Sequence, residues 1–187
     1  MKKYLIQSIR LTAVLLLLLG AVYPLIVALA GGFSKGNGGG EKITLNGKVV
    51  GYALLGQSFT QPAYFWGRPS ATGYNAARSG GSNKGPSNAD YLKEVSNRID
   101  FLLRYHPYLK KENIPADMVT ASGSGLDPNI SEQGAIMQIR RIAAYRKLDQ
   151  KKVAALVVEN TKGPFLGLFG PSSVNVLELN LALDQLK

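Results

Sequence analysis

The chain contains no cysteine, one histidine and one tryptophan among its 187 residues. Without cysteine it can form no disulfide, no thiolate metal site and no cysteine nucleophile. A triad based on histidine could use only His106, which stands before Pro107 at an expected helix end. A capping or surface role is the favoured interpretation of His106. Packing alone must therefore hold the fold.

The chain also lacks the motifs that mark most nucleotide-dependent enzymes. There is no G-x-x-x-x-G-K-[ST] phosphate loop, no dinucleotide fingerprint and no D-K-T-G-T aspartyl-phosphate motif. Ser124 lacks the G-x-S-x-G frame of a nucleophile elbow. The run that starts at Asp127 copies three positions of a calcium loop but lacks its glycine and its final glutamate. We therefore predict no catalytic residue, no metal site and no firmly bound cofactor.

Acidic residues are scarce: 12 Asp and Glu stand against 22 Lys and Arg, which gives a formal net charge of +10. A basic balance can favour anionic lipid headgroups or an acidic partner. The charges are dispersed, so a solvated basic surface is the simpler interpretation. Aromatic residues do not alternate with the basic clusters as they do in nucleic-acid grooves. Membrane lipid is therefore an expected partner, and nucleic acid is not.

What the chain does have is an uncharged run from Leu11 to Ala30, after a short basic start. Twenty helical residues span about 30 Å, the thickness of a bilayer's hydrocarbon core. We predict that residues 1–10 are cytoplasmic and that residues 11–30 form a single transmembrane anchor in the cell membrane. The basic residues before the run favour this orientation, and everything after Ala30 is then extracytoplasmic.

Several positions in the run suit an anchor that lies against other helices. Tyr23 and Pro24 are compatible with a membrane span. Thr12, Gly20 and Ala21 are small or polar, which allows close helix packing in lipid. A cleaved secretory signal is the alternative, since residues 28–30 fit an A-x-A cleavage site. The run is longer than the usual signal core of about 7–15 residues, so a retained anchor is favoured.

The rest of the chain divides into a linker and one domain. Residues 31–42 include six glycines within Gly31–Gly40 and predict a flexible tether. Residues 43–187 are a usual size for one compact domain. Asn46-Gly47 predicts a β-hairpin, with a second strand that could run to Leu55. Together with the helices below, the hairpin predicts a mixed α+β domain.

Three helices are predicted by capping residues followed by apolar residues at helical spacing. For the first helix, Ser87, Asn88 and Asp90 supply the cap and the first-turn acid, and it ends before Pro107. The other two begin at caps Ser131 and Asp149. The predicted inner face of the second consists of Ala135, Ile136, Ile139, Ile142 and Ala143. Residues 177–186 fit either a strand or a helix. We favour a strand at 174–176 followed by a helix.

Between these elements lie two irregular stretches, 57–86 and 110–130, and such stretches often carry function. The first contains a cluster of large side chains, which are candidates for partner contact: Tyr64, Phe65, Trp66 and Arg68. A buried aromatic corner is the alternative, with Arg68 as an internal brace to loop carbonyls or to Asp127. Further candidate contact or structural positions are Ser79, Gly80, Gly81, Ser82, Asn83, Thr120, Ser122, Ser124 and Asp127.

Several of these segments occur in a recognisable order over nearly the whole chain. They are Tyr23-Pro24, Leu55-Gly56-Gln57-x-Phe59, Tyr64-Phe65-x-x-Arg68-Pro69-Ser70-Ala71, Ser79-Gly80-Gly81-Ser82-Asn83, Val119-Thr120-Ala121-Ser122-x-Ser124-Gly125-Leu126-Asp127 and Val174-Asn175-Val176-Leu177-x-Leu179-Asn180-x-Ala182-Leu183-Asp184. In this order they resemble the C subunit of the Kdp potassium-transporting ATPase. The glycine-rich tether is the least characteristic part.

The resemblance implies a non-catalytic subunit that assembles and stabilises an ATP-driven potassium importer. Its implied partners are a channel-like potassium-binding subunit, a P-type ATPase subunit and a small helical subunit. The family is described as a catalytic chaperone that raises the ATP affinity of the ATPase subunit, so ATP would enter through that subunit. The alternatives are a membrane-anchored hydrolase or ligand-binding protein that acts alone, and a cell-surface adaptor.

Overall fold

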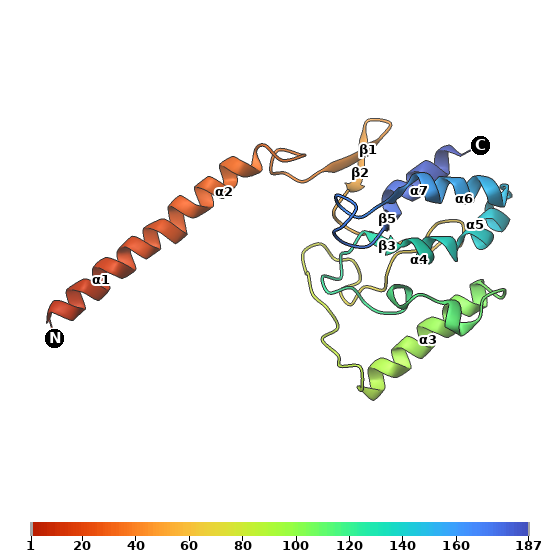
Figure 1. Cartoon of the computed structure of the whole chain (residues 1–187), viewed down its shortest axis with the longest axis horizontal. Helices are drawn as coiled ribbons and strands as arrows, with labels where there is room; N and C mark the ends of the chain where they lie inside the picture. The colour runs from red at the N-terminus through yellow and green to blue at the C-terminus, as the bar shows by residue number, and fades with distance from the viewer. Residues whose placement is uncertain (1, 187) are drawn as a thin grey trace. The chain divides into compact units, whose positions relative to one another are not determined.

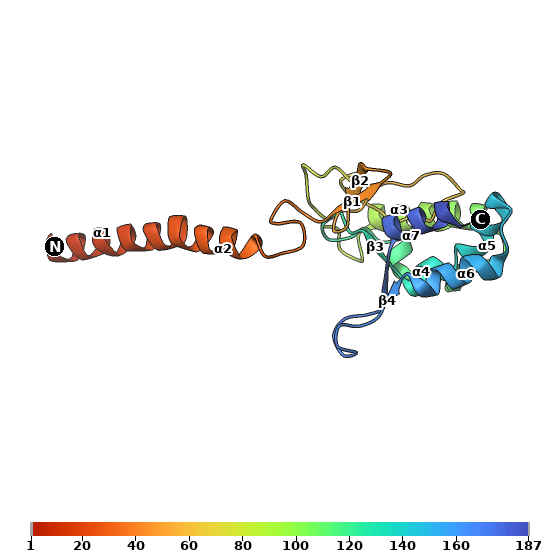
Figure 2. The ribbon, with the colours of Figure 1, turned by 90° about the horizontal axis from the view of Figure 1, so that it is seen from above.

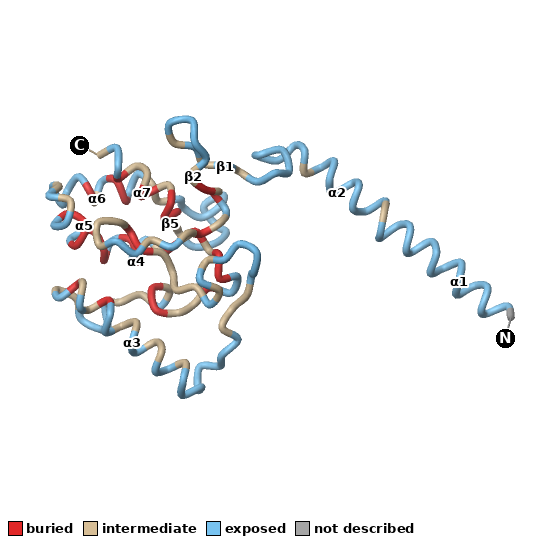
Figure 3. The backbone as a smooth tube through the Cα atoms, turned by 180° about the vertical axis from the view of Figure 1, so that it is seen from behind, coloured by how far each residue is buried: buried red, intermediate tan, exposed pale blue. Residues whose placement is uncertain are grey.

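The computed structural model describes residues 2–186, which form two compact units, one up to Lys42 and the other from Ile43 onward. The first unit is helical from α1 (Lys2–Leu17) through the π-helical η1 (Leu18–Val22) to α2 (Tyr23–Gly31). Within it, Lys3–Gly31 is long and apolar enough to cross a membrane. Its helix is exposed along its length (Figure 3).

The π-helical turn in the first unit has a local cause. Proline lacks an N–H and its ring crowds the preceding turn, and Pro24 stands in the first turn of α2. Just before it, the Tyr23 N–H donates to the Leu18 carbonyl, five residues back. This wider turn keeps the helix continuous through the proline. Beyond Gly31 the chain forms turns, with left-handed φ at Gly36, Gly38 and Gly40.

The second unit is a mixed α+β domain, as predicted (Figures 1 and 2). The hairpin is present as β1 (Lys42–Leu45) and β2 (Lys48–Tyr52), which pair in a two-stranded sheet. A second sheet has the antiparallel order β3-β5-β4, with Ile130 opposite Val174 and Thr161 also opposite Val174. Its strands are β3 (Asn129–Ser131), β4 (Thr161–Lys162) and β5 (Ser173–Asn175).

The caps predicted at Ser131 and Asp149 are confirmed, and of the residues predicted at the start of the first helix Asn88 is the cap. Asn88 accepts from the Tyr91 N–H at the start of α3 (Ala89–Tyr105). The Ser131 hydroxyl accepts from the Gly134 N–H, and the Asp149 carboxylate from the Lys151 N–H. The helices that follow are α4 (Glu132–Ile136), α5 (Ile139–Arg146) and α6 (Gln150–Glu159). In the tail, α7 (Val176–Gln185) follows β5, so the favoured interpretation of the tail is confirmed to within one residue.

The structure corrects three local predictions. The helix after Ser131 is interrupted at residues 137–138, where the Gln138 N–H donates to Ala135, three residues back. Because the interruption turns the face, Ile136 is half exposed and Met137 is buried instead. The second hairpin strand ends at Tyr52, short of Leu55. Two short 3-10 helices, Lys111–Asn113 and Ala116–Met118, lie in the second irregular stretch.

One hydrophobic core joins α3 to α7, and Figure 3 shows the buried residues gathered there. His106 caps the C-terminus of α3, but its ring is fully buried, so the surface interpretation is wrong. Its Nδ1–H donates to the Leu102 carbonyl at 2.8 Å, and its Nε2 accepts from Arg141 Nε at 3.0 Å. Both ring nitrogens of the neutral imidazole are therefore used. Burial lowers the pKa of His106 from its ordinary 6.5 to about 4.

This lowered pKa predicts acid sensitivity. Below pH 6.5 the unfolded chain protonates His106 while the folded chain keeps it neutral down to about pH 4. Its contribution to stability is therefore complete above pH 6.5 and declines between pH 6.5 and 4. The decline should reach roughly 2–3 kcal/mol at pH 4.5.

Urea unfolding of the full chain in detergent, at pH 7 and pH 4.5, measures this loss. His106→Gln keeps an acceptor for Arg141 but cannot titrate. The variant should be less stable than wild type at pH 7, and its free energy of unfolding should fall less between pH 7 and pH 4.5. Carboxylates contribute equally to both proteins, so an identical pH dependence of wild type and variant would contradict the assignment.

Candidate functional site

The segment around Tyr64–Arg68 belongs to no helix and to neither sheet. Two buried side-chain amides pair with its peptide groups in place of a neighbouring strand. Asn180 of α7 accepts from the Phe65 N–H at 2.8 Å and donates to the Phe65 carbonyl at 3.0 Å. Gln138 does the same for Trp66, at 2.8 and 3.1 Å. The segment is thereby fixed to α7 and to the N-terminus of α5.

This arrangement places two of the predicted contact residues in the core. Phe65 is 0% exposed and Trp66 is 6% exposed. For these two side chains the buried aromatic corner, the alternative interpretation, is what the structure shows. Trp66 packs edge-on against Tyr105 and His106, and its Nε1–H donates to the Gln61 carbonyl at 2.9 Å. A partner could reach Tyr64 and Arg68, which are only partly buried.

Beneath Trp66 lies a buried cation, Arg141 of α5, whose guanidinium carbon is 3.9 Å from the ring centroid. Its side chain makes four hydrogen bonds, and all four acceptors are uncharged. They are His106 Nε2, Gln138 Oε1 and the carbonyls of Pro62 and Tyr64. Burial lowers the pKa of Arg141 to about 10, so it stays charged at neutral pH.

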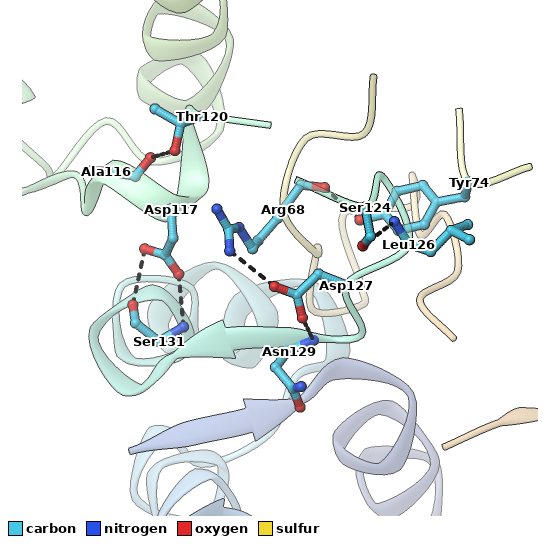
Figure 4. Close-up of polar contacts among 10 residues, drawn as sticks. All are labelled: Arg68, Tyr74, Ala116, Asp117, Thr120, Ser124, Leu126, Asp127, Asn129 and Ser131. Atoms are coloured by element: carbon cyan, nitrogen blue, oxygen red, sulfur yellow. Dashed lines mark hydrogen bonds and ion pairs between the residues drawn. The ribbon is translucent and has the colours of Figure 1, made fainter. Parts of the chain in front are cut away.

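Arg68 forms the second polar centre. Its Nη1 is 2.9 Å from a carboxylate oxygen of Asp127, and the other oxygen of Asp127 accepts from the Asn129 N–H (Figure 4). This is the contact expected of an internal brace. In the part of the chain that the structure describes, the Nε of Arg68 is buried without a hydrogen-bond partner. The Tyr74 hydroxyl donates to the Arg68 carbonyl, and burial together with the Asp127 charge raises the pKa of Tyr74 to about 12.

The loops on either side of this ion pair meet at Gly125. The Ser70 hydroxyl donates to the Gly125 carbonyl at 2.6 Å. The Gly80 N–H donates to the Ser124 carbonyl at 2.8 Å, and the Ser79 hydroxyl donates to the same oxygen. Gly125 has φ +69°, and a Cβ there would lie 2.8 Å from the Gly80 carbonyl oxygen. Only glycine therefore lets these loops approach so closely.

The remaining candidates surround this junction or lie apart from it. Ser122 is buried, and its N–H donates to the Pro69 carbonyl. A Cβ on Gly81 would lie 3.2 Å from the Gly123 carbonyl oxygen. Ser82 is half-buried, and Asn83 is exposed with φ +52°. The Thr120 hydroxyl donates to Ala116, away from the junction (Figure 4). These polar groups hold the loops together, as hydroxyls and amides often do.

A cavity of about 350 Å³ opens beside Arg68. Its walls are mainly apolar, with a second cation, Arg98, whose Nη1 donates to the Val119 carbonyl. The aromatic lining residues are Phe59, Trp66, Tyr74 and Phe101. Apolar walls with a few directed cations suit an anionic group attached to an apolar body. Across residues 2–186, no group of three His, Asp or Glu side chains could hold a metal ion.

Sequence reasoning missed Gln138, Arg141 and Asn180. All three look like ordinary helical polar residues in the sequence. The available signal was helical spacing from apolar residues: Gln138 lies three residues after Ala135 and four before Ile142, and Asn180 lies four residues after Val176 and three before Leu183. A polar residue on a buried face calls for a specific partner.

These observations define the class: a mixed α+β domain joined by a glycine-rich segment to one helix long enough to cross a membrane. The family model described as "K+-transporting ATPase, c chain" matches residues 5–185. A potassium-transporting ATPase KdpC subunit of Flavobacterium johnsoniae is 57% identical over 185 residues, covering 99% of this chain and 100% of the relative. That of Phocaeicola vulgatus is 50% identical, with 99% and 100% covered.

A more distant relative, the KdpC subunit of Caldanaerobacter subterraneus, is 45% identical over 178 residues, covering 95% of this chain and 92% of its own. The chain therefore belongs to the KdpC family of potassium-transporting ATPase subunits. Membership gives it an accessory role in potassium transport, as a membrane-protein subunit with one candidate transmembrane helix.

The loop junction yields a sharp test with a matched control. Gly125→Ala forces a left-handed φ on alanine and drives its Cβ against backbone, so it should cost more than about 2 kcal/mol of stability. Gly123 has no atom within 4 Å of a built Cβ and no left-handed φ. Gly123→Ala should therefore stay within about 0.5 kcal/mol of wild type. Urea unfolding of the full chain compares them, and equal losses would contradict the assigned role of Gly125.

Proposed function

We propose that this chain is a non-catalytic subunit that assembles and stabilises an ATP-driven potassium importer. The observation that carries the proposal is the match to KdpC subunits over 99% of the chain. The geometry agrees, because the one histidine spends both ring nitrogens on structural hydrogen bonds. The loop hydroxyls Ser70 and Ser79 likewise donate to backbone carbonyls. Such groups position a surface and do not activate a nucleophile.

The proposed partners are the channel-like potassium-binding subunit, the P-type ATPase subunit and the small helical subunit of the same complex. The helix Lys3–Gly31 would hold the chain in the cell membrane. The basic residues before the apolar run favour a cytoplasmic N-terminus, and the domain from Ile43 onward would then lie outside. Thr12, Gly20 and Ala21 would then pack against partner helices, since small residues permit close approach in lipid. No nucleic acid and no firmly bound cofactor enter this scheme.

The proposed chaperone role, raising the ATP affinity of the ATPase subunit, must fit this topology. ATP is cytoplasmic, so an outer domain can act on it only through the transmembrane partners. This requires that the chain bind one conformational state of its partners more tightly than another. By reciprocity, nucleotide binding to the ATPase subunit would then change the affinity of that complex for this chain.

The partner-facing part of the domain is proposed to include the two partly buried side chains of this segment, Tyr64 and Arg68. Tyr64 is stacked by Arg146, whose guanidinium carbon lies 4.5 Å from the ring centroid. Arg146 in turn pairs with Asp184 at 2.7 Å. Arg68 borders the cavity and keeps an unpaired Nε. Arginine and tyrosine are the residue types that most often anchor interfaces.

Arg68→Ala tests this surface. The Arg68–Asp127 pair is a quarter exposed on both sides, and such pairs contribute about 0–1 kcal/mol. The variant should therefore melt within a few degrees of wild type, yet co-purify less well with the channel-like subunit in mild detergent. Asp127→Asn is the control, because it breaks the same ion pair but leaves the arginine in place. It should keep assembly intact.

A large loss of stability in both variants, with assembly lost in parallel, would show that Arg68 braces the fold instead.

The same purification addresses the alternative of a membrane-anchored hydrolase or ligand-binding protein. Wild-type protein that emerges without large polytopic partners would contradict the subunit assignment.

A further inference from the structure

The connection from β4 to β5 is an apolar loop that projects from the domain. Figure 2 shows it extending beyond β4, away from the helices. Four large side chains at its tip are 64–81% exposed: Phe165, Leu166, Leu168 and Phe169. Burying such side chains in the core is the usual outcome of folding. Their common exposure therefore indicates a surface that contacts another protein or a membrane.

The side chains of this loop offer no polar contact. Residues 163–171 read Gly-Pro-Phe-Leu-Gly-Leu-Phe-Gly-Pro, and none of these side chains donates or accepts a hydrogen bond. Charge returns only at the base, where Lys162 pairs with Glu178 at 2.6 Å. Protein interfaces carry about one hydrogen bond per 100–200 Å², and the residues that contribute most to their affinity are tryptophan, tyrosine and arginine, with leucine under-represented. This loop has none of those residues.

The backbone of the tip is already hydrogen-bonded within the loop. Phe165 and Phe169 exchange both N–H···O bonds, at 2.8 and 2.9 Å. The N–H groups of Gly167 and Leu168 donate to Pro164 and Phe165. Four of the five N–H groups from Phe165 to Phe169 are thus paired internally. Leaving water would therefore cost the tip few N–H hydrogen bonds, and a segment that enters lipid must satisfy its backbone donors itself.

The same chain supplies a bilayer within reach. The turn-rich segment between Gly31 and the hairpin spans about ten residues, which extend to at most roughly 35 Å. A helix that crosses the membrane would hold the domain within that distance of the lipid surface. The basic balance of the chain adds attraction to anionic headgroups. An apolar tip above a charged base suits the boundary between headgroups and acyl chains.

We propose that the tip from Pro164 to Phe169 inserts into the surface of the bilayer that holds the chain's own helix. It would act as a second membrane contact and fix the orientation of the domain over the membrane. Because one anchor already confines the domain, even weak insertion of the tip is effectively intramolecular. This inference is independent of the proposed chaperone role.

The lack of cysteine makes the test direct. A single cysteine at Leu168, carrying a nitroxide label, is introduced into the full chain reconstituted in phosphatidylethanolamine–phosphatidylglycerol liposomes. Its collision rates with oxygen, which concentrates in lipid, and with an aqueous nickel chelate report immersion. Glu112→Cys, on an exposed polar turn, is the matched control. Insertion predicts an oxygen-to-nickel ratio several-fold higher at position 168 than at position 112.

A second variant distinguishes insertion into lipid from a label that is merely shielded from the aqueous nickel chelate by the protein. Adding Phe165→Asp to the labelled Leu168→Cys chain places a charge at the tip, so the ratio at 168 should fall to that of the control. Equal ratios at 168 and 112 in the original chains would overturn the proposal. Protection at 168 that arises only when the other ATPase subunits are co-reconstituted would overturn it too, since the loop would then dock on protein.

Discussion

The buried guanidinium of Arg141 is the contact on which the architecture of the domain most depends. It joins α5 to the C-cap of α3 through His106, and to the segment that carries Tyr64 through the carbonyls of Pro62 and Tyr64. Because its acceptors are uncharged, it is held by a ring of dipoles and by the face of Trp66. A buried cation is costly unless every donor is directed, so this geometry admits little variation.

The position of Arg68 follows from the hydrogen bonds of Arg141. Arg141 binds the carbonyls of Pro62 and Tyr64, and Asn180 and Gln138 pair with the next two peptide groups. These bonds fix the position from which the Arg68 side chain reaches Asp127. The loops that meet at Gly125 then close around it. The polar residues of the irregular stretches thus support one another. Two surfaces remain: Tyr64 and Arg68, proposed for partner subunits, and the apolar tip between β4 and β5, proposed for lipid.

The parts of the fold that local sequence determines were predictable. A cap acts within three residues, so Asn88, Ser131 and Asp149 mark helix starts, and Asn46-Gly47 marks the hairpin turn. The family was predictable from ordered motifs and is confirmed over residues 5–185. The brace from Arg68 to Asp127 was foreseen as one of two interpretations, because both residue types occur in candidate segments.

The long-range part was not predictable, because its partners are distant in sequence. Gln138 meets Trp66 72 residues away, and Asn180 meets Phe65 115 residues away. Neither spacing leaves a periodic signal. Ile136 was placed in the core because a continuous helix would put it there, but the break at Gln138 turns it outward. The tip residues Phe165 and Leu168 were passed over, since composition alone does not show that a loop projects from the domain.

The central claim, that the Arg141 cluster organises the domain, is tested by one matched comparison. A lysine at 141 keeps the charge but cannot reach four acceptors, so Arg141→Lys should lower the free energy of unfolding of the full chain by about 2–4 kcal/mol. Arg140→Lys makes the same change at an exposed neighbour that lies over the Tyr108 ring and should stay within about 1 kcal/mol of wild type. Equal stability of the two variants in urea titration would contradict the account.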